Sequence, residues 1–234
     1  MKRLLLTLIA LVVVATSFAQ SAEQATSDVS KLQKLAEAGD AIAQSELGVC
    51  YHSGNVVAKD VVEAAKWWRM SAEQGFSPAQ YLLGRCYQTG EGVTKDLAEA
   101  VKWFRKAAEQ GLAEAQYNLA LHYYNGWGVT QDYAEAVKWF RAAAEQGDVN
   151  AQCSLFYCYC NGEGVTQDAV EAVKWCRKAA EQGDAEAQYI LARCYYKAIG
   201  GKLDLNESLK WLRKSAEQGY EEAVQAVNRM NKTW

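Results

Sequence analysis

Small and apolar side chains recur along the chain at the spacing of an amphipathic helix. Ala79, Leu83, Cys86 and Tyr87, for example, follow the pattern i, i+4, i+7 and i+8, which places them on one stripe of a helix. The pattern returns every 36 residues together with the mark A-E-[QA]-G, which begins at Ala36, Ala72, Ala108, Ala144, Ala180 and Ala216. A fixed period of this length predicts an array of stacked helical repeats.

Each repeat is predicted to hold two helices joined by a glycine-rich turn. The second helix starts at an Asp that is followed three residues later by a Glu. In such a capping box the Asp accepts from the first-turn N–H groups and the Glu reaches back to the cap. The helix ends at a glycine, which readily takes the left-handed conformation. The pairs are Asp60 and Glu63, Asp96 and Glu99, Asp132 and Glu135, Asp168 and Glu171, and Asp204 and Glu207; the glycines are Gly75, Gly111, Gly147, Gly183 and Gly219.

The predicted fold class is all-α: a right-handed α/α superhelical solenoid of about five 36-residue helix-turn-helix repeats with half-repeat caps. Residues 28–38 have the pattern of a lone second helix, and residues 221–230 that of a lone first helix. The predicted parts are an N-terminal stub with the start of its capping helix at 20–35, repeats at 36–71, 72–107, 108–143, 144–179 and 180–215, and a C-terminal capping helix at 216–234. The recurrent Trp67, Trp103, Trp139, Trp175 and Trp211 are expected to serve this stacking.

Residues 1–19 have the composition of a secretory signal peptide. Lys2 and Arg3 precede an apolar run over residues 4–15, and the small Ser17 and Ala19 suit cleavage after Ala19. The run is too short for a spanning helix, and no later stretch approaches the roughly 20 apolar residues that a span needs. We therefore expect an exported protein, periplasmic or fully secreted, with no membrane span in the mature chain.

Composition and charge exclude further classes of protein. The chain has 25 Lys and Arg against 28 Asp and Glu, a net charge of -3, which argues against a nucleic-acid partner. Half of the residues are hydrophobic and only one is proline, which excludes a disordered linker or a collagen-like fibre. On the second helices Lys and Arg alternate with Glu at i, i+3 and i, i+4, so this outer face is expected to neutralise itself.

The chain resembles the Sel-like repeat family, a branch of the tetratricopeptide superfamily, over about residues 36–219. The marks that carry the resemblance are A-E-Q-G, A-Q-Y-x-L, Y-x-x-G-x-G-V-x-x-D and E-A-V-K-W-F-R-K-A. The first turn, G-N-V-V-A-K-D, and the fifth, A-I-G-G-K-L-D, depart from this pattern, so their shapes are expected to differ. The resemblance implies an α/α superhelix that serves as an adaptor for other proteins.

The resemblance also implies an alternative function. Some cysteine-rich secreted members of the family are penicillin-binding or weakly β-lactamase-like proteins, so a cell-wall-directed protein of that kind is the second hypothesis. In those members disulfides join paired cysteines near each repeat junction, where this chain has Ala180 and Gln188. The cysteine pattern of this chain is therefore different.

The residues themselves favour no enzyme. The motif G-x-G-V-x-x-D at Gly90, Gly126 and Gly162 lacks the strand and the third glycine of a dinucleotide fingerprint. The signatures S-x-x-K, G-x-S-x-G and H-E-x-x-H do not occur in the sequence. His52 and His122 lie in different repeats with no recurring carboxylate partner. We therefore predict no catalytic residue and no cofactor, and a β-lactamase activity would rest on family analogy alone.

The seven cysteines of an exported chain raise the question of disulfides. Cys176 takes the place that Phe104 and Phe140 hold in other repeats and is expected to face inward. A disulfide from Cys176 to Cys158 or Cys194 would form if the Cα atoms come within about 7 Å. Four cysteines share one position of the buried stripe, where a small apolar side chain suffices: Cys50, Cys86, Cys158 and Cys194.

The remaining cysteines do not predict a metal site. Cys153 and Cys160 are separated by about 10 Å along one helix face, which is too far for a direct bond or one shared metal. Cys158 and Cys160 point to different helix faces. Because seven is an odd number, at least one thiol stays free or pairs with another molecule.

The candidate binding site lies opposite the buried stripe of the first helices. By analogy with tetratricopeptide arrays, first helices line a concave groove, and Tyr and Arg are enriched at binding hot spots. These positions also vary between repeats while the buried positions recur. The predicted groove residues are Tyr81, Arg85, Gln88, Tyr117, Leu121, Tyr124, Tyr157, Tyr189, Arg193 and Tyr196.

An alternative explanation for these tyrosines is solvated packing, in which the rings shield stacked helices and the hydroxyls reach water. On the binding hypothesis the chain is a non-enzymatic adaptor for a protein or peptide. The sequence names neither the partner nor the oligomeric state.

Overall fold

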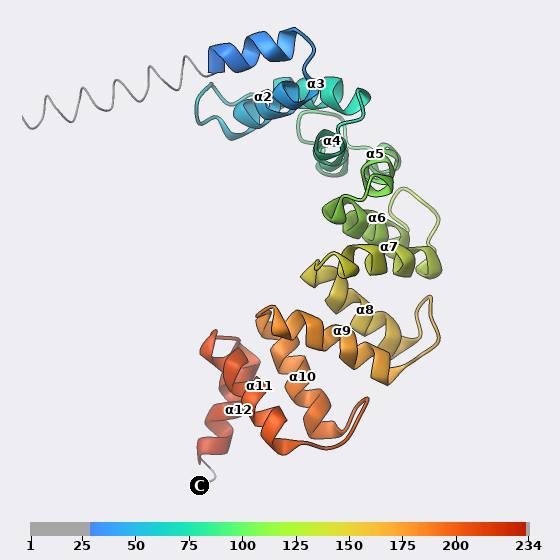
Figure 1. Ribbon diagram of the computed structural model, residues 1–234, viewed down its shortest axis with the longest axis vertical. Helices are drawn as coiled ribbons and strands as arrows, with labels where there is room; N and C mark the ends of the chain where they lie inside the picture. The colour runs from blue at the N-terminus through green and yellow to red at the C-terminus, as the bar shows by residue number, and fades with distance from the viewer. Residues whose placement is uncertain (1–28, 233–234) are drawn as a thin grey trace, which may run out of the picture. The chain divides into compact units, whose positions relative to one another are not determined.

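The computed structural model describes residues 29–232, and every regular element in that range is a helix (Figure 1). The predicted signal peptide, residues 1–19, lies outside the described residues. The chain forms two compact units that meet between Lys106 and Ala107, within α5 (Leu97–Glu109), and each unit is described by itself.

Both units consist of helix pairs. The first begins with a helix over residues 29–37 and continues with α2 (Ala41–Ser53), α3 (Val61–Glu73) and α4 (Ser77–Thr89) before reaching α5. In the second unit each helix packs on the next one along the chain. Its helices are α6 (Ala113–Asn125), α7 (Tyr133–Glu145), α8 (Val149–Asn161), α9 (Ala169–Glu181), α10 (Ala185–Lys197), α11 (Leu205–Glu217) and α12 (Glu221–Lys232). The prediction of an all-α repeat fold with a lone helix at each end of the array is confirmed.

The second helix of each repeat begins at the predicted Asp. The side chain of Asp60 accepts from the backbone N–H groups of Val62 at 3.0 Å and of Glu63 at 2.9 Å. The prediction that the Glu side chain accepts from the N–H of the capping Asp is wrong, because the N–H of Asp60 donates to the carbonyl of Tyr51 at 2.9 Å. Glu63 instead pairs with Lys66, with 2.8 Å between Oε2 and Nζ. The bond from the Asp N–H to a Tyr carbonyl recurs in all five hairpins and closes each turn against its own first helix.

Glycines end the second helices as predicted, and a glycine also ends four of the five first helices. The five glycines after the second helices have φ between 83° and 99°, which is the left-handed region. The first helices of repeats one to four end at Gly54, Gly90, Gly126 and Gly162, all in the same conformation. In the fifth repeat, whose turn departs from the pattern, Ala198 takes this place with a φ of 57°. Left-handed backbone is unfavourable for a residue with a Cβ, so this turn is the strained one.

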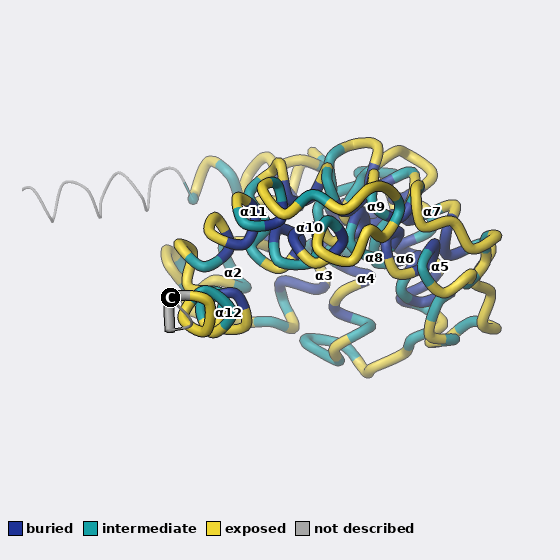
Figure 2. The backbone as a smooth tube through the Cα atoms, turned by 90° about the horizontal axis from the view of Figure 1, so that it is seen from below, coloured by how far each residue is buried: buried dark blue, intermediate teal, exposed yellow. Residues whose placement is uncertain are grey.

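The core of each repeat pairs a large side chain with a small one. A Cβ added to Gly48 would lie 2.5 Å from Trp68 Nε1, and one added to Gly84 would lie 2.8 Å from Phe104 Cδ1. The aromatic ring of the second helix therefore fills the space that the glycine of the first helix leaves. In Figure 2 the buried residues lie along the helices, and the turns are mostly exposed.

The fourth repeat reverses this arrangement. The repeat register places Ala120 with Phe140 and Ala192 with Leu212, but in the fourth repeat it places Phe156 on the first helix and Cys176 on the second. Phe156 is 8% exposed and Cys176 is 1% exposed. In this repeat the large residue thus stands on the first helix and the small one on the second.

Buried glutamines join successive helices. Gln152 is 3% exposed, and its Nε2 donates to the carbonyl of Ala144 at 3.0 Å. Its Oε1 accepts from Nε2 of Gln182 at 2.9 Å, so one side chain links the ends of α7 and α9 to α8. The same acceptor bond joins the following pairs: Gln44 and Gln74, Gln116 and Gln146, and Gln188 and Gln218. These bonds explain why Gln recurs in both A-Q and A-E-Q-G.

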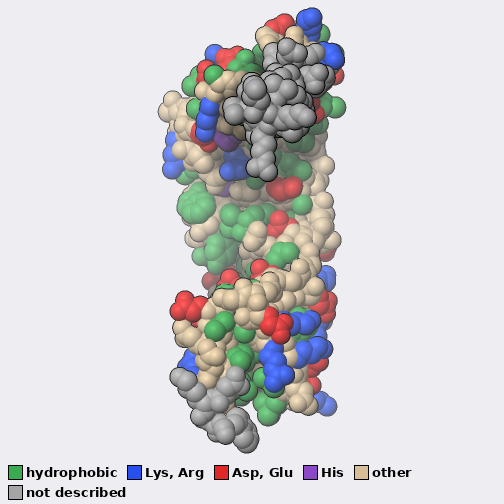
Figure 3. Space-filling model, turned by 90° about the vertical axis from the view of Figure 1, so that its left-hand side faces the viewer, with side chains coloured by type: hydrophobic (Ala, Val, Ile, Leu, Met, Phe, Trp, Pro, Cys, Tyr) green, Lys and Arg blue, Asp and Glu red, His purple; other side chains and the backbone are tan. Residues whose placement is uncertain are grey.

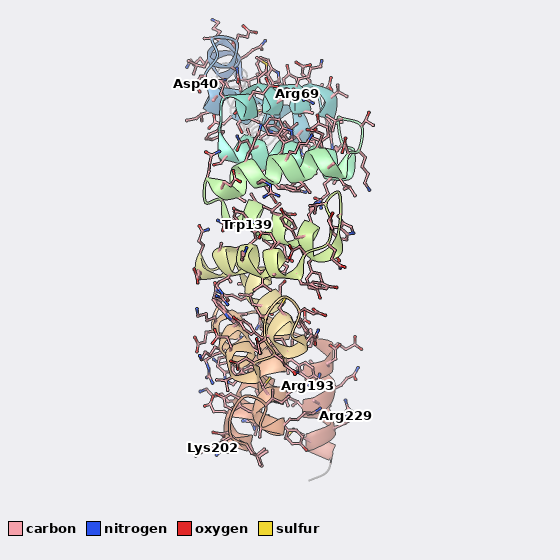
Figure 4. The ribbon with its side chains drawn as sticks, turned by 90° about the vertical axis from the view of Figure 1, so that its right-hand side faces the viewer. Asp40, Arg69, Trp139, Arg193, Lys202 and Arg229 are labelled. Carbon is pink, nitrogen blue, oxygen red and sulfur yellow. The ribbon has the colours of Figure 1, made fainter. Side chains whose placement is uncertain are left out.

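Ion pairs between Lys and Glu neutralise part of the charge on the outer face of the second helices. All five Lys–Glu pairs at i, i+3 are present, with Nζ to Oε distances of 2.5 to 2.9 Å. The arginines were expected to pair with Glu as well, but Arg69 and Arg177 each donate at 2.6 Å to a tyrosine hydroxyl of the following first helix. Arg69 of α3 and Trp139 of α7 are labelled in Figure 4.

Candidate partner-binding site

A hollow of about 270 Å³ opens between α6 and α8 in the second unit. We call it the second-unit hollow. The side chain of Phe140 from α7 is almost fully buried and supplies its apolar floor, whereas Tyr157 of α8 is 44% exposed at its rim. The lining residues are Leu121, Tyr124, Phe140, Ser154, Tyr157 and Asn161.

Three contacts hold the side chain of Tyr124 in place. It meets Tyr133 edge-on at 5.0 Å between ring centroids and Phe140 at 6.2 Å. Its hydroxyl donates to Oε2 of Glu163 at 2.6 Å, and Glu163 comes from the glycine turn that follows α8. This hydrogen bond, together with burial, raises the pKa of Tyr124 far above the ordinary value of a phenol, so the residue stays a neutral donor.

Tyr157 lies on the opposite rim and makes a similar contact with a carboxylate. Its hydroxyl donates to Oε1 of Glu186 at 3.4 Å, and Glu186 lies in the first turn of α10. Burial, then the charge of Glu186, raises the pKa of Tyr157 to about 12. Each rim tyrosine of the second-unit hollow thus has a carboxylate next to its hydroxyl.

The other predicted residues of the second unit lie on the same first helices. Tyr117 packs on Phe140 at 5.8 Å between ring centroids. Tyr189 packs on Tyr220 at 5.4 Å, and the guanidinium of Arg193 lies 5.7 Å from the Tyr189 ring centroid. Tyr196 is 63% exposed. Arg193 is labelled on α10 in Figure 4.

The first unit has a hollow at the equivalent position, with a volume of about 230 Å³. Subtracting 72 residues, two repeats, from the six lining positions of the second-unit hollow gives 49, 52, 68, 82, 85 and 89, all of which line the first-unit hollow. Nε2 of His52 lies 3.3 Å from Oε1 of Glu91 in this hollow, and the His52 ring packs at 5.4 Å on Trp68. Equivalent hollows therefore form between the first helices of repeats one and two and of repeats three and four.

The structure places the predicted groove residues in two groups, one in each unit. Arg85 lines the first-unit hollow, and Leu121, Tyr124 and Tyr157 line the second. Tyr81 lies against Phe104, with 5.9 Å between ring centroids, in the way that Tyr117 lies against Phe140. Gln88 is half-buried, so several predicted residues both pack and border the surface.

Sequence reasoning missed Glu91, which lines the first-unit hollow, and Glu163, which accepts from the hydroxyl of the lining residue Tyr124. Glu91 and Glu163 occupy the same position in the motif G-E-G-V, directly after the first helix. The repeated Glu in this turn was the available signal. The distance from the turn to the tyrosines depends on how one repeat stacks on the next, which the motif does not state.

All seven cysteines are free thiols in the structure. Burial raises the pKa of Cys158 to about 12 and that of Cys194 to about 11, so these thiols stay protonated and serve as small apolar groups. Sγ of Cys176 donates to the carbonyl of Ala187 at 3.3 Å. A bond from Cys176 to Cys158 or Cys194 stays a prediction. Over residues 29–232, no group of three or more His, Cys, Asp or Glu is arranged to hold a metal ion.

His122 fills the cysteine position in the third repeat and is fully buried. Its Nδ1 lies 2.6 Å from the carbonyl of Trp127, and burial lowers its pKa, although that carbonyl opposes the shift. The residue therefore packs as a neutral imidazole.

The repeat register agrees with a known family. The Sel1 repeat model matches residues 41–76, 77–112, 113–148, 149–184 and 185–220. Each match begins at the first residue of a first helix, namely α2, α4, α6, α8 and α10. The chain belongs to the Sel1 repeat family. Sel1 repeat proteins are in general scaffolds for protein interaction, and the family is typically non-enzymatic.

Two solved structures resemble this Sel1 repeat chain over most of its length. A protective antigen of uropathogenic Escherichia coli with an SLR fold is 47% identical, with a TM-score of 0.81 over 83% of this chain and 42% of the antigen. The chain therefore spans less than half of the antigen. A Sel1 repeat protein from Oxalobacter formigenes is 36% identical, with a TM-score of 0.81 over 92% of this chain and 88% of that one. Comparison with curated proteins gave no match.

Figure 3 shows one face of the Sel1 repeat chain, with patches of hydrophobic side chains between charged ones. Within residues 29–232, no helix combines the length and the apolar character required to cross a membrane.

Proposed function

We propose that this chain is an exported, non-enzymatic adaptor that binds a peptide or a segment of a partner protein on the face of its first helices. The observation that carries the proposal is the second-unit hollow, which combines an aromatic floor, an exposed Tyr157 and polar groups at the rim. Interfaces concentrate binding energy in aromatic side chains around such partly enclosed apolar positions.

The hollow also bears on the alternative of solvated packing. Tyr117 fits that alternative in part, because it is half-buried against Phe140. Tyr157 fits it less well, since 44% of the residue remains exposed beside an unfilled volume of about 270 Å³. A partner side chain in the hollow would remove this aromatic surface from water, and that burial favours association.

The alternative of a penicillin-binding or β-lactamase-like protein finds less support in the same residues. Ser154 lines the second-unit hollow and carries a hydroxyl, which donates to the carbonyl of Asn150 at 2.9 Å. The other lining residues include neither a Lys nor a His that could act as its base. The proposal therefore keeps the family's scaffold role.

The proposal predicts a loss of binding when the hollow is altered. Replacing both Leu121 and Tyr157 with Ala should weaken partner capture by more than about tenfold, because aromatic hot spots contribute about 2 kcal/mol or more. The measurement is pull-down from the native host after crosslinking, with quantitative mass spectrometry and a melting curve for each variant.

The matched control is Val170→Ala, which removes an apolar side chain that is 53% exposed on the second helix α9. This control should capture the partner as the unaltered chain does. Full capture by a folded Leu121→Ala, Tyr157→Ala variant would show that binding, if present, uses another surface.

A further inference from the structure

We propose that the N-terminal end of the first unit is a dimer interface, at which the same aliphatic face of two copies of this chain packs together. We call this surface the end face. It consists of Leu32 and Leu35 on the helix at 29–37 and of Ile42 and Val49 on α2. The end face shares no residue with the second-unit hollow, so the inference is independent of the proposed function.

Leu35 is exposed because the helix at 29–37 is a second helix without its own first helix. Leu35 is 55% exposed, whereas the residues at its position in the five complete repeats are all fully buried. Ser71 shows what covers this position, since its Oγ donates at 2.6 Å to the carbonyl of Ala41 on the first helix of the same repeat. The described part of the chain has no such helix for Leu35. The buried equivalents are Ser71, Ala107, Ala143, Ala179 and Ser215.

Ile42 and Val49 border the same uncovered position. Adding 144 residues, four repeats, to position 42 gives Glu186, which accepts from Tyr157 of the preceding first helix. Adding 108 residues, three repeats, to position 49 gives Tyr157, which lines the second-unit hollow together with Leu121 of the preceding first helix. Within residues 29–232 no first helix precedes α2, and Ile42 and Val49 are each about half exposed.

The residue types at this end differ from those at the other end of the array. A terminal helix of a repeat array requires a polar outer face for solubility. The helix α12 meets this requirement, because exposed Gln225, Asn228 and Arg229 stand where α6 has an aromatic and two apolar residues. The end face has aliphatic residues instead, although position 42 is proline, Glu or Asn in every later repeat. Aliphatic side chains that gather on an exposed surface mark an interaction site.

The rest of this chain offers no cover for the end face. The predicted cleavage after Ala19 leaves Q-S-A-E-Q-A-T-S-D before the helix at 29–37, a segment without Val, Ile, Leu or an aromatic residue. The outer face of α12 from another copy is unsuitable as well. Packing it on aliphatic residues would bury the amides of Gln225 and Asn228 without hydrogen-bond partners, which is unfavourable. The surface of this molecule that matches the end face is the end face of a second copy.

A twofold arrangement also matches the charges beside the aliphatic residues. Lys34 on the helix at 29–37 and Glu46 on α2 are both exposed. Because a twofold axis sets each helix against the other copy, Lys34 of either chain can pair with Glu46 of the other. Twofold dimers are the commonest homo-oligomers, and their interfaces are more apolar than the rest of the surface. The polar outer face of α12 then limits the assembly to two copies.

The test uses the exported chain purified from its native host, with its N-terminus established by mass spectrometry. Sedimentation equilibrium between about 1 and 100 μM should show single chains in equilibrium with dimers, and no larger species. The double variant Leu35→Glu, Ile42→Glu should raise the Kd of the dimer by about a hundredfold or more, because each copy would bring two carboxylates into an apolar contact. Both positions are more than half exposed in the single chain, so the variant should stay folded.

The matched control is Val170→Glu, which makes the same kind of change at an aliphatic residue on α9 that is 53% exposed, and it should leave the Kd unchanged. Single chains at every concentration would overturn the inference and would leave the end face to a different protein or to solvent. A dimer that persists in the folded double variant would overturn it too, as would assemblies larger than two copies. Failure of the proposed function is measured separately, by the capture experiment on the Leu121→Ala, Tyr157→Ala variant.

Discussion

Replacing Phe156 with Ala should lower the free energy of unfolding by about 3 to 5 kcal/mol, the usual cost of removing a buried phenyl ring. Adding Cys176→Phe to this variant should recover most of the loss. The double variant recreates the pair that the third repeat uses, where Ala120 stands on the first helix and Phe140 on the second. The physical reason is that each repeat holds one large side chain at this junction, and either helix can supply it.

Cys176→Phe alone should lower the free energy of unfolding by about 1 to 3 kcal/mol, because it adds a second ring to a filled site. Urea unfolding of the unaltered chain, the two single variants and the double variant gives the coupling energy between the positions. A double variant no more stable than Phe156→Ala would show that the exchange of large and small residues does not explain Cys176. It would then favour a specific role for that thiol.

Replacing Gln152 with Leu should lower the free energy of unfolding by about 1 to 3 kcal/mol. The change keeps an apolar stem but removes the two hydrogen bonds of a buried side chain, to the carbonyl of Ala144 and from the amide of Gln182, and each is worth about 0.5 to 1.5 kcal/mol. The Ala144 carbonyl keeps its bond from the N–H of Gly147, and the Gln182 amide keeps its bond to the carbonyl of Gly147. Because the bonds join three helices, the loss should appear in the transition of the second unit as a whole.

The matched control for this glutamine is Gln225→Leu on the exposed side of α12, where a change within about 0.5 kcal/mol is expected. Equal stability of Gln152→Leu and Gln225→Leu in urea unfolding would contradict the assignment of Gln152 as the bond that joins successive repeats.

The helices were predictable from the sequence because their signals are local. An Asp at the start of a helix and a glycine after its end act within a few residues, and each signal occurs five times in the sequence. The prediction that Glu63 accepts from the Asp60 N–H was wrong, because the true partner of this N–H lies more than a few residues away in the chain. The Asp60 N–H meets the carbonyl of Tyr51, nine positions earlier in the chain.

The candidate site was predictable only in part. The first-helix positions could be read from the repeat, and they include Leu121, Tyr124 and Tyr157 of the second-unit hollow. The floor residue Phe140 comes from a second helix, and Glu163, which accepts from the Tyr124 hydroxyl, comes from the turn of the following repeat. Their approach to the tyrosines is set by the stacking of repeats, which local patterns do not encode.

The most direct measurement of the central claim is site-specific photocrosslinking in the native host. A photoreactive amino acid in place of Tyr157 reports what touches the second-unit hollow, and the same group in place of Lys174 reports the outer face of α9. The account predicts a discrete protein adduct from position 157 and none from position 174. An adduct from position 174 with none from position 157 would contradict it.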